Sequence, residues 1–214
     1  MTPYYADDLV TIYHGDAREL GLSIATPAAL VSDPPYGIGA TTANRSRGRG
    51  RVAVAHDWPA VVGDDAPFDP APWLEFPEVI LWGANHYADR LPTSPSWLVW
   101  DKRIDLGSND SADCEIAWTN LGGPARVFRH RWQGMLRDSE RGESYHPTQK
   151  PVALMRWCIG MTVAPLVIDP FMGSGSTLVA AKSLGRRAIG IEIEERYCEI
   201  AARRCAQEVL GLAV

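Results

Sequence analysis

The sequence predicts an α/β fold built on one mostly parallel sheet. Short apolar runs rich in β-branched and aromatic residues alternate with segments of helical periodicity through most of the 214 residues. Three of these runs end at or next to an acid, namely Asp33, Asp169 and Glu192. No internal repeat or linker interrupts the pattern, so we expect a single domain over residues 1–214.

The amino-terminal part is expected to contain five strands. Strand-forming residues dominate the ranges 9–13, 29–31, 78–82, 97–100 and 114–118, and residues 127–132 are expected to be extended. A helix is expected over residues 16–24, before Thr26-Pro27, and a short helix should end within residues 73–76. Residues 41–58 contain glycine and arginine without apolar periodicity, which predicts a loop.

The carboxyl-terminal part alternates helix and strand most regularly. Pro151 suits the first turn of a helix that continues through the 3.6-residue pattern of VALMRWCIGMT. We then expect strands over residues 166–168 and 187–191, and helices over residues 178–184 and 194–210. Strands that alternate with helices in this way predict parallel pairing.

Composition restricts the class of protein. Apolar residues make up 46% and charged residues 22% of the chain, as in soluble globular proteins. There is no run of 18 apolar residues and no basic start followed by an apolar stretch, so we expect neither a membrane span nor a secretory signal. The four cysteines form no CxxC pair and have no histidine at ligand spacing. They are expected to be buried thiols in a reducing cytoplasm, without a metal site.

Charge is unevenly distributed along the chain. The net charge is −5, yet arginines stand at positions 45, 47, 49 and 51, and again at 126, 129, 131, 137 and 141. These are two local basic segments on an otherwise acidic protein. They are either binding surfaces or solvated surface segments.

The segment LVSDPPYGIG, residues 30–39, combines an acceptor, a rigid carbonyl and an aromatic ring. Asp33 follows a buried strand, and Pro34 and Pro35 fix φ near roughly −65° while removing two backbone donors. The Pro34 carbonyl therefore has a fixed direction, and Tyr36 offers a flat face for stacking. The combination favours a grip on a planar group that carries an NH2, with an ordinary proline-rich turn as the alternative.

A second motif spans residues 166–192, LVIDPFMGSGSTLVAAKSLGRRAIGIE, and predicts a strand, a glycine-rich turn, a helix and a second strand. Gly173 and Gly175 allow the backbone to approach a ligand, toward which the N–H groups of the helix point. Glu192 ends the second strand, where an acid can bind two ribose hydroxyls.

The composition of this turn favours S-adenosylmethionine over other nucleotide ligands. Ser176-Thr177 stands where a P-loop has lysine, and Leu178 replaces the third glycine of the dinucleotide fingerprint. Asp169 would repel a pyrophosphate but suits a sulfonium cation. A dinucleotide site and a purely structural glycine turn are the alternatives.

The segment HPTQKP, residues 146–151, lies just before this motif. His146, Thr148 and Lys150 form either a polar lip for the methionine end of the cofactor or a capped helix start within a solvated loop.

The motifs DPPY, HPTQKP, DPFMGSGST and GIEIEERY, in this order, resemble the amino-group DNA methyltransferases with the permuted β-type motif order. The resemblance extends over residues 15–197. It implies a Rossmann-like, S-adenosylmethionine-dependent methyltransferase fold with helices on both faces of the sheet. It also implies a catalytic half over about residues 1–145 and a cofactor half over about residues 146–214.

The resemblance implies roles for individual residues. Asp33 and the Pro34 carbonyl would accept hydrogen bonds from the amino group of a flipped base, on which Tyr36 would stack. The implied catalytic residues are Asp33, Pro34, Pro35 and Tyr36. The implied cofactor-binding residues are Asp16, Asp33, His146, Thr148, Lys150, Asp169, Pro170, Phe171, Gly173, Ser174, Gly175, Ser176, Thr177 and Glu192. The implied DNA-binding residues are Arg45, Arg47, Arg49, Arg51, Arg126, Arg129 and Arg131.

The expected function is therefore site-specific methylation of adenine N6 in DNA, because the resemblance links DPPY rather than SPPY to adenine. Cytosine N4 is the alternative base. An RNA or protein-amide methyltransferase and a catalytically silent DNA-binding module are rival classes. About 60 residues separate Asn85 from His146, so the target-recognition segment within about residues 86–145 is expected to be short or absent. A homodimer, a specificity partner and a companion restriction enzyme are each compatible with the sequence.

Overall fold

The centre of the molecule is a sheet in which the described residues form nine strands, with the strand order β1-β2-β11-β10-β3-β4-β6-β5-β7. The computed structural model describes residues 2–20, 27–39, 61–108, 112–134, 136–142 and 144–207. The strands of the sheet are β1 (Tyr5–Ala6), β2 (Val10–His14), β3 (Ala28–Ser32), β4 (Glu78–Trp82), β5 (Trp97–Asp101), β6 (Cys114–Thr119), β7 (Arg126–Arg129), β10 (Leu166–Asp169) and β11 (Arg187–Glu192). A separate ribbon pairs β8 (Trp132–Gln133) with β9 (Leu136–Arg137).

Strand direction gives the sheet one edge at which most carboxyl ends meet. Strands β2, β11, β10, β3 and β4 are parallel neighbours. Strand β6 runs antiparallel to both β4 and β5, so β5 regains the direction of β4, and β7 is parallel to β5. Five of the eight pairings within the described sheet are parallel, which confirms the mostly parallel sheet.

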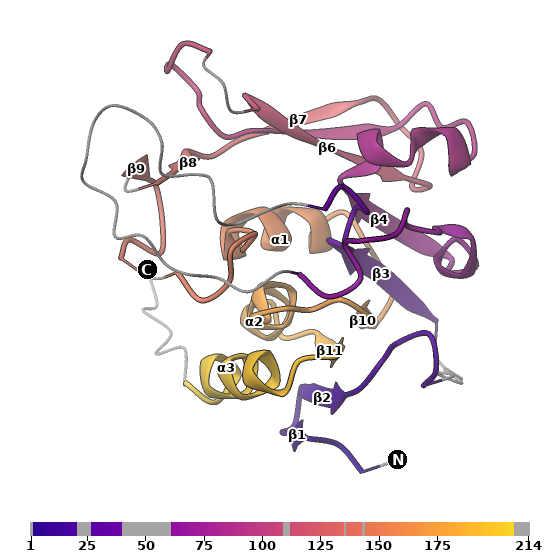
Figure 1. Cartoon of the computed structure of the whole chain (residues 1–214), viewed down its shortest axis with the longest axis vertical. Helices are drawn as coiled ribbons and strands as arrows, with labels where there is room; N and C mark the ends of the chain where they lie inside the picture. The colour runs from indigo at the N-terminus through magenta and orange to yellow at the C-terminus, as the bar shows by residue number, and fades with distance from the viewer. Residues whose placement is uncertain are drawn as a thin grey trace.

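In the part of the chain that the structure describes, three α-helices cover one face of the sheet. Helices α1 (Val152–Ile159), α2 (Ser176–Ser183) and α3 (Glu195–Ala206) pack in succession, α1 on α2 and α2 on α3 (Figure 1). Alternate strand residues, such as Val31, Ile80 and Val167, point into the core beneath them.

The opposite face is covered by shorter segments. Leu30, Val79, Leu81 and Ile191 pack there against Trp73, at the end of the 3₁₀ helix η2 (Ala71–Trp73). The 3₁₀ helices η3 (Ala84–His86) and η4 (Ala88–Arg90) lie in the same part of the chain. Helices thus cover both faces as expected, but short 3₁₀ turns replace α-helices on this one, where closely spaced prolines interrupt the chain.

Most predicted elements are observed. The strand predicted over residues 78–82 coincides with β4, and the other predicted strands differ from β2, β3, β5, β6, β10 and β11 only at their ends. Helix α2 begins two residues earlier than predicted because Gly175, with φ +81°, serves as its N-cap. The expected helix over residues 16–24 is wrong for its described part, where residues 16–20 form a turn closed on the Asp16 carbonyl. Residues 41–58, Val209 and Leu210 lie outside the described residues.

The cysteines follow the prediction in part. Cys158, Cys198 and Cys205 are buried, whereas Cys114, at the start of β6, is half-buried. Within the described ranges, every helix is too short or too polar to cross a bilayer.

Candidate active site

The acids predicted from the sequence meet at the carboxyl edge of the parallel strands. Asp33 follows β3, Asp169 ends β10 and Glu192 ends β11. Strand β10 lies between the other two, with Ile168 opposite Leu30 on β3 and Asp169 opposite Gly190 on β11. The three acids therefore lie at the ends of adjacent parallel strands, and such strands are spaced by roughly 4.8 Å.

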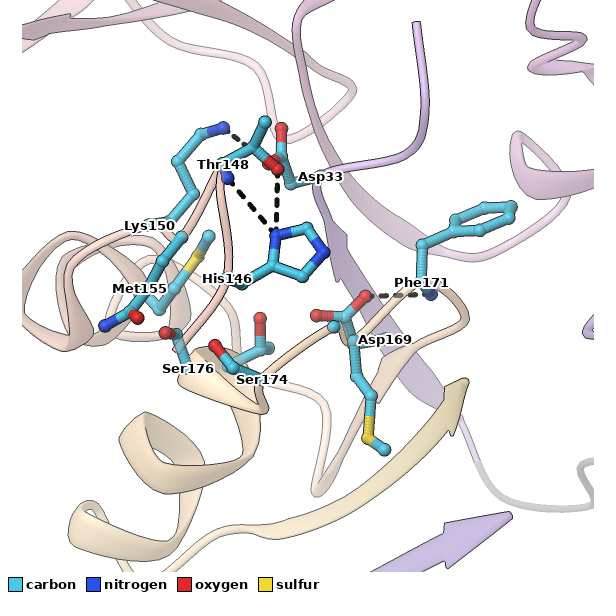
Figure 2. A pocket seen from close by; sticks show the side chains of 13 residues that line it. Asp33, His146, Thr148, Lys150, Met155, Asp169, Phe171, Ser174 and Ser176 are labelled. Atoms are coloured by element: carbon cyan, nitrogen blue, oxygen red, sulfur yellow. Dashed lines mark hydrogen bonds and ion pairs between the residues drawn. The ribbon is translucent and has the colours of Figure 1, made fainter. Parts of the chain in front are cut away.

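A pocket at this edge joins the two predicted motifs (Figure 2). Of the predicted residues, it is lined by Asp33, His146, Thr148, Lys150, Asp169, Phe171, Gly173, Ser174, Ser176 and Thr177. Its three other lining residues, Gln149, Met155 and Met172, were not among the predicted site residues, although Gln149 and Met172 lie within the predicted motifs. Asp33 and the glycine turn therefore face the same space, as transfer between them would require.

Four residues predicted to bind the cofactor are not among the residues that line the pocket. These are Asp16, Pro170, Gly175 and Glu192. Glu192 accepts a hydrogen bond at Oε2 from the Gly173 N–H at 3.0 Å, so it supports the glycine turn directly. Asp16 is paired with Arg18 at 2.6 Å, and Gly15 next to it donates to the Glu192 carbonyl at 2.9 Å.

Asp33 is held by two residues of the predicted set. Tyr36 donates its hydroxyl hydrogen to Oδ1, and the Lys150 ammonium lies 2.5 Å from Oδ2 and 3.2 Å from the Tyr36 hydroxyl oxygen. Figure 2 shows Lys150 reaching across to Asp33 from the far side of the pocket. Burial raises the pKa of Asp33, and the positive charge of Lys150 offsets part of that rise. Lys150 thus contacts the catalytic motif, although the sequence placed it at the cofactor.

Glu115, on β6, is a site residue that the sequence reasoning missed. Its Oε2 lies 3.1 Å from the Lys150 ammonium and its Oε1 lies 2.8 Å from that of Lys102. Burial raises the pKa of Glu115, but the two lysines outweigh it and lower the value to about 2. The available signal was a lone acid within the apolar strand CEIAW.

The buried carboxylates of the cofactor half have no cationic partner among the described residues. Asp169 accepts hydrogen bonds at Oδ1 from the Ser32 hydroxyl at 2.6 Å and the Phe171 N–H at 3.1 Å. Burial raises the pKa of Asp169 to about 6, and burial likewise raises that of Glu192 to about 7. Two such acids favour a cationic ligand.

The conformation of the turn itself depends on glycine. Gly173 and Gly175 have φ values of +48° and +81°, which side chains rarely adopt. A Cβ at position 175 would stand 2.7 Å from the Cβ of Ala201, so only glycine lets α3 pack this closely. Arg204 of α3 then donates to the Ser174 carbonyl at 2.7 Å and pairs with Glu140 at 3.0 Å, which ties the turn to the segment before HPTQKP.

His146 is positioned as a neutral ring. Its Nδ1 accepts a hydrogen bond from the Thr148 N–H at 3.2 Å, so the proton lies on Nε2. Burial lowers the pKa of His146 to about 4, with a further contribution from Lys150. The ring lies against Tyr197, with 4.4 Å between ring centroids.

Tyr36 is wedged by residues that the sequence did not indicate. Its ring stacks on His86 with 4.9 Å between centroids and 16° between planes. Gly83, with φ +71°, lies so close that a Cβ there would stand 1.9 Å from Tyr36 Cε1. Asp64 fixes the following turn by accepting the Gly37 N–H at 2.8 Å. The segment after β4 therefore sets the position of the aromatic ring.

The predicted DNA-binding arginines are placed in part. Arg45, Arg47, Arg49 and Arg51 lie outside the described residues. Arg126 and Arg129 are exposed at the two ends of β7, and Arg131 is half-buried just beyond it. Because β7 is parallel to β3, Arg129 and Arg131 lie at the same sheet edge as Asp33, while Arg126 lies at the opposite end.

Asp169→Asn should stabilise the unliganded chain at high pH. The amide oxygen can accept the same two Oδ1 hydrogen bonds. Because the folded pKa is raised, the folded state favours the protonated Asp169 side chain, and the charged carboxylate opposes folding as pH rises from 3.8 through about 6. The variant should therefore unfold several degrees higher at pH 8, from a shift worth about 3 kcal/mol at most, and at the same temperature at pH 4. Thermal unfolding followed by circular dichroism at both pH values checks this; equal midpoints at pH 8 would contradict it.

Comparison with known proteins finds sequence similarity to DNA methylases over part of the chain. Residues 99–203 match the N6_N4_Mtase family, described as DNA methylase, a range that includes Lys150 and the glycine turn but not Asp33. The type II methyltransferase M2.LlaDCHI of Lactococcus lactis subsp. cremoris is 34% identical over 114 residues, which cover 52% of this chain and 42% of that protein. The chain spans less than half the length of the curated relatives it matches.

Two solved structures share the fold. The PvuII cytosine-N4-specific DNA methyltransferase superposes with a TM-score of 0.62 at 16% identity, covering 97% of this chain and 90% of that one. The complex of M1.HpyAVI with SAM gives a TM-score of 0.56 at 22% identity, covering 92% of this chain and 100% of that one. The Rossmann-like methyltransferase fold expected from the sequence is thereby confirmed. Residues 99–203 thus resemble the N6/N4 DNA methylases in sequence, and the chain has the Rossmann-like fold of a methyltransferase.

Proposed function

We propose that this protein transfers a methyl group from S-adenosylmethionine to the N6 amino group of adenine in DNA. The observation that carries the proposal is a single pocket in which Asp33 of the DPPY motif faces the glycine turn of the cofactor half. The preference for adenine depends on the resemblance of the DPPY motif, since the comparisons support an amino-methyltransferase without distinguishing the base.

The cofactor half fits S-adenosylmethionine. When bound, this cofactor supplies a methyl group on a positively charged sulfur, which leaves as a neutral thioether when the amine nitrogen takes the methyl. Asp169 and Glu192 are buried acids without a cation among the described residues, and Glu192, which accepts the Gly173 N–H, is assigned to the ribose hydroxyls. Gly173 lines the pocket without a side chain, and Gly175 lets α3 pack closely behind the turn. His146 and Thr148 line the same pocket and are assigned to the methionine end.

The catalytic half prepares the amine. The lone pair of an exocyclic amine is delocalised into the base, which makes the nitrogen a poor nucleophile. Asp33 and the Pro34 carbonyl can accept hydrogen bonds from the two N–H groups of this amine. They would draw the hydrogens out of the ring plane and stabilise positive charge on nitrogen. Each such preorganised contact contributes about two to three powers of ten in rate. No metal is required for this chemistry.

The target base must leave the duplex to reach Asp33, since the pocket lies inside the carboxyl edge of the sheet. Tyr36 would offset part of the unstacking free energy by stacking on the flipped base. In the structure one face of this ring stacks on the imidazole of His86.

Arg129 and Arg131, at the same edge of the sheet as Asp33, are assigned to contacts with the DNA backbone. Arg129→Ala and Arg131→Ala should each weaken DNA binding at low salt and reduce the slope of log K against log salt by about 1. Arg187→Ala is the matched control, because Arg187 is exposed at the amino end of β11, at the opposite sheet edge. Fluorescence anisotropy with a labelled duplex at several salt concentrations measures the slopes. Equal slopes for all three variants would mean that Arg129 and Arg131 are solvated side chains that do not contact the DNA backbone.

The proposed function is tested by tritiated methyl transfer from S-adenosylmethionine to unmethylated DNA, followed by digestion and nucleoside chromatography. Label in N6-methyldeoxyadenosine is the expected result. Label in N4-methyldeoxycytidine would assign the alternative base. Label in RNA or protein, or none in DNA although the cofactor binds, would overturn the proposal.

A further inference from the structure

The catalytic carboxylate is fully engaged by the protein itself. Tyr36 donates to Oδ1 of Asp33, and the Lys150 ammonium lies 2.5 Å from Oδ2. The Lys150 side chain is only 6% exposed, so the ammonium cannot simply turn into water. An amino group that is to be methylated must therefore compete with Lys150 for the same oxygen atoms.

The competition becomes sharper during the reaction. The amine nitrogen turns positive as it gains the methyl group, and it stays positive until it releases a proton to solvent. A second cation within a few ångströms of that nitrogen, in a poorly solvated pocket, opposes the developing charge. Lys150 thus stabilises the empty site, where it offsets the buried charge of Asp33. It destabilises the reacting complex, in which the amine nitrogen becomes positive.

Glu115 lies where a displaced ammonium could go. Its Oε2 is 3.1 Å from the Lys150 nitrogen, yet this buried oxygen makes no well-directed hydrogen bond with any described residue. The other oxygen is held at 2.8 Å by Lys102. Lys102 therefore keeps Glu115 charged while leaving one oxygen available.

We propose that Glu115 is a positioning residue that receives the Lys150 ammonium when the amino group of the target base takes its place at Asp33. The inference depends on the proposed amine methylation. Lys102, Glu115, Lys150 and Asp33 alternate in sign, so a small movement of one ammonium shifts charge between two carboxylates without leaving either one unpaired. Glu115 acts through Lys150 and does not itself contact the base.

The test compares single-turnover methyl transfer at saturating S-adenosylmethionine and DNA. Glu115→Gln removes the second carboxylate and should lower the rate constant about tenfold to a hundredfold. Its dissociation constant for S-adenosylmethionine should stay within about threefold, because the glycine turn is untouched. Glu199→Gln, an exposed acid on α3 paired with Arg203, is the matched control and should react at the unaltered rate.

A double-mutant cycle separates positioning from a structural role. If Glu115 acts through Lys150, Glu115→Gln should not slow transfer in a protein that already carries Lys150→Met. The double variant should then react at the same rate as Lys150→Met alone. Slowing that persists without Lys150, a parallel loss of cofactor binding, or no slowing at all would each overturn the inference.

Two further outcomes are informative. If Glu115→Gln does not fold, Glu115→Asp replaces it in the same cycle: its shorter side chain should slow transfer several-fold, and an unchanged rate would overturn the inference. If the unaltered protein methylates no DNA, the proposed function fails first and the inference fails with it. Failure of the inference alone is seen against an active unaltered protein.

Discussion

Asp33→Ala should reduce methyl transfer at least about a thousandfold, since it removes both an acceptor and the negative charge that faces the reacting amine. Binding of S-adenosylmethionine should be largely retained, because the glycine turn is held by Glu192 and Arg204 and not by Asp33. The fold should persist as well, because Lys150 keeps Glu115 as its partner. Single-turnover kinetics and isothermal titration calorimetry with the cofactor measure the two quantities.

Two companion variants sharpen this prediction. Asp33→Asn preserves shape and one acceptor oxygen but not the charge, so it should be about a hundredfold slower than the unaltered chain. Asp65→Ala removes an exposed acid and should react normally. If Asp33→Ala lost cofactor binding together with turnover, Asp33 would be a structural residue.

Gly83→Ala should lower methyl transfer about a hundredfold by displacing Tyr36. The added Cβ would stand 1.9 Å from Tyr36 Cε1, closer than any packing allows, so the ring must move and release its hydrogen bond to Asp33. The positive φ of +71° adds backbone strain of about 1 kcal/mol or more. Single-turnover kinetics and thermal unfolding report the two effects separately.

The matched control for this variant is Gly122→Ala. Gly122 has a similar φ of +74°, but a Cβ there would meet no atom within 4 Å. It should therefore lose only the stability that the positive φ costs, while reacting at the normal rate. Similar rates for both variants would mean that the position of Tyr36 does not limit the reaction.

Periodicity and turn chemistry were sufficient to predict most of the fold. The strands around β3, β4, β10 and β11 are continuous apolar runs, as expected for strands covered on both faces, and Gly175 marks the start of α2. The placement of Asp33 and Asp169 at one edge followed from parallel pairing. Residues 16–20 were misjudged because a short polar segment can close a turn as well as a helix.

The part of the site that the sequence did not reveal is contributed by tertiary contacts. Gly83 and His86 are 47 and 50 positions after Tyr36, and no local pattern marks them as its neighbours. Glu115 looks like an ordinary polar position in a strand until Lys102 and Lys150 are brought around it. Long-range juxtapositions of this kind depend on how strands are ordered in the sheet, which one sequence does not specify.

Because β6 runs antiparallel to its neighbours, the ion pairs that link Lys102, Glu115, Lys150 and Asp33 are sensitive to insertions in this strand. Glu115 reaches the carboxyl edge because β6 runs against its neighbours, with Glu115 opposite Trp100 on β5. Side chains alternate between the faces of a strand, so a register slip of a single residue would turn Glu115 away from Lys150. Inserting or deleting one residue within β6 should thus lower the rate of methyl transfer, although every residue of the DPPY motif and the glycine turn stays in place.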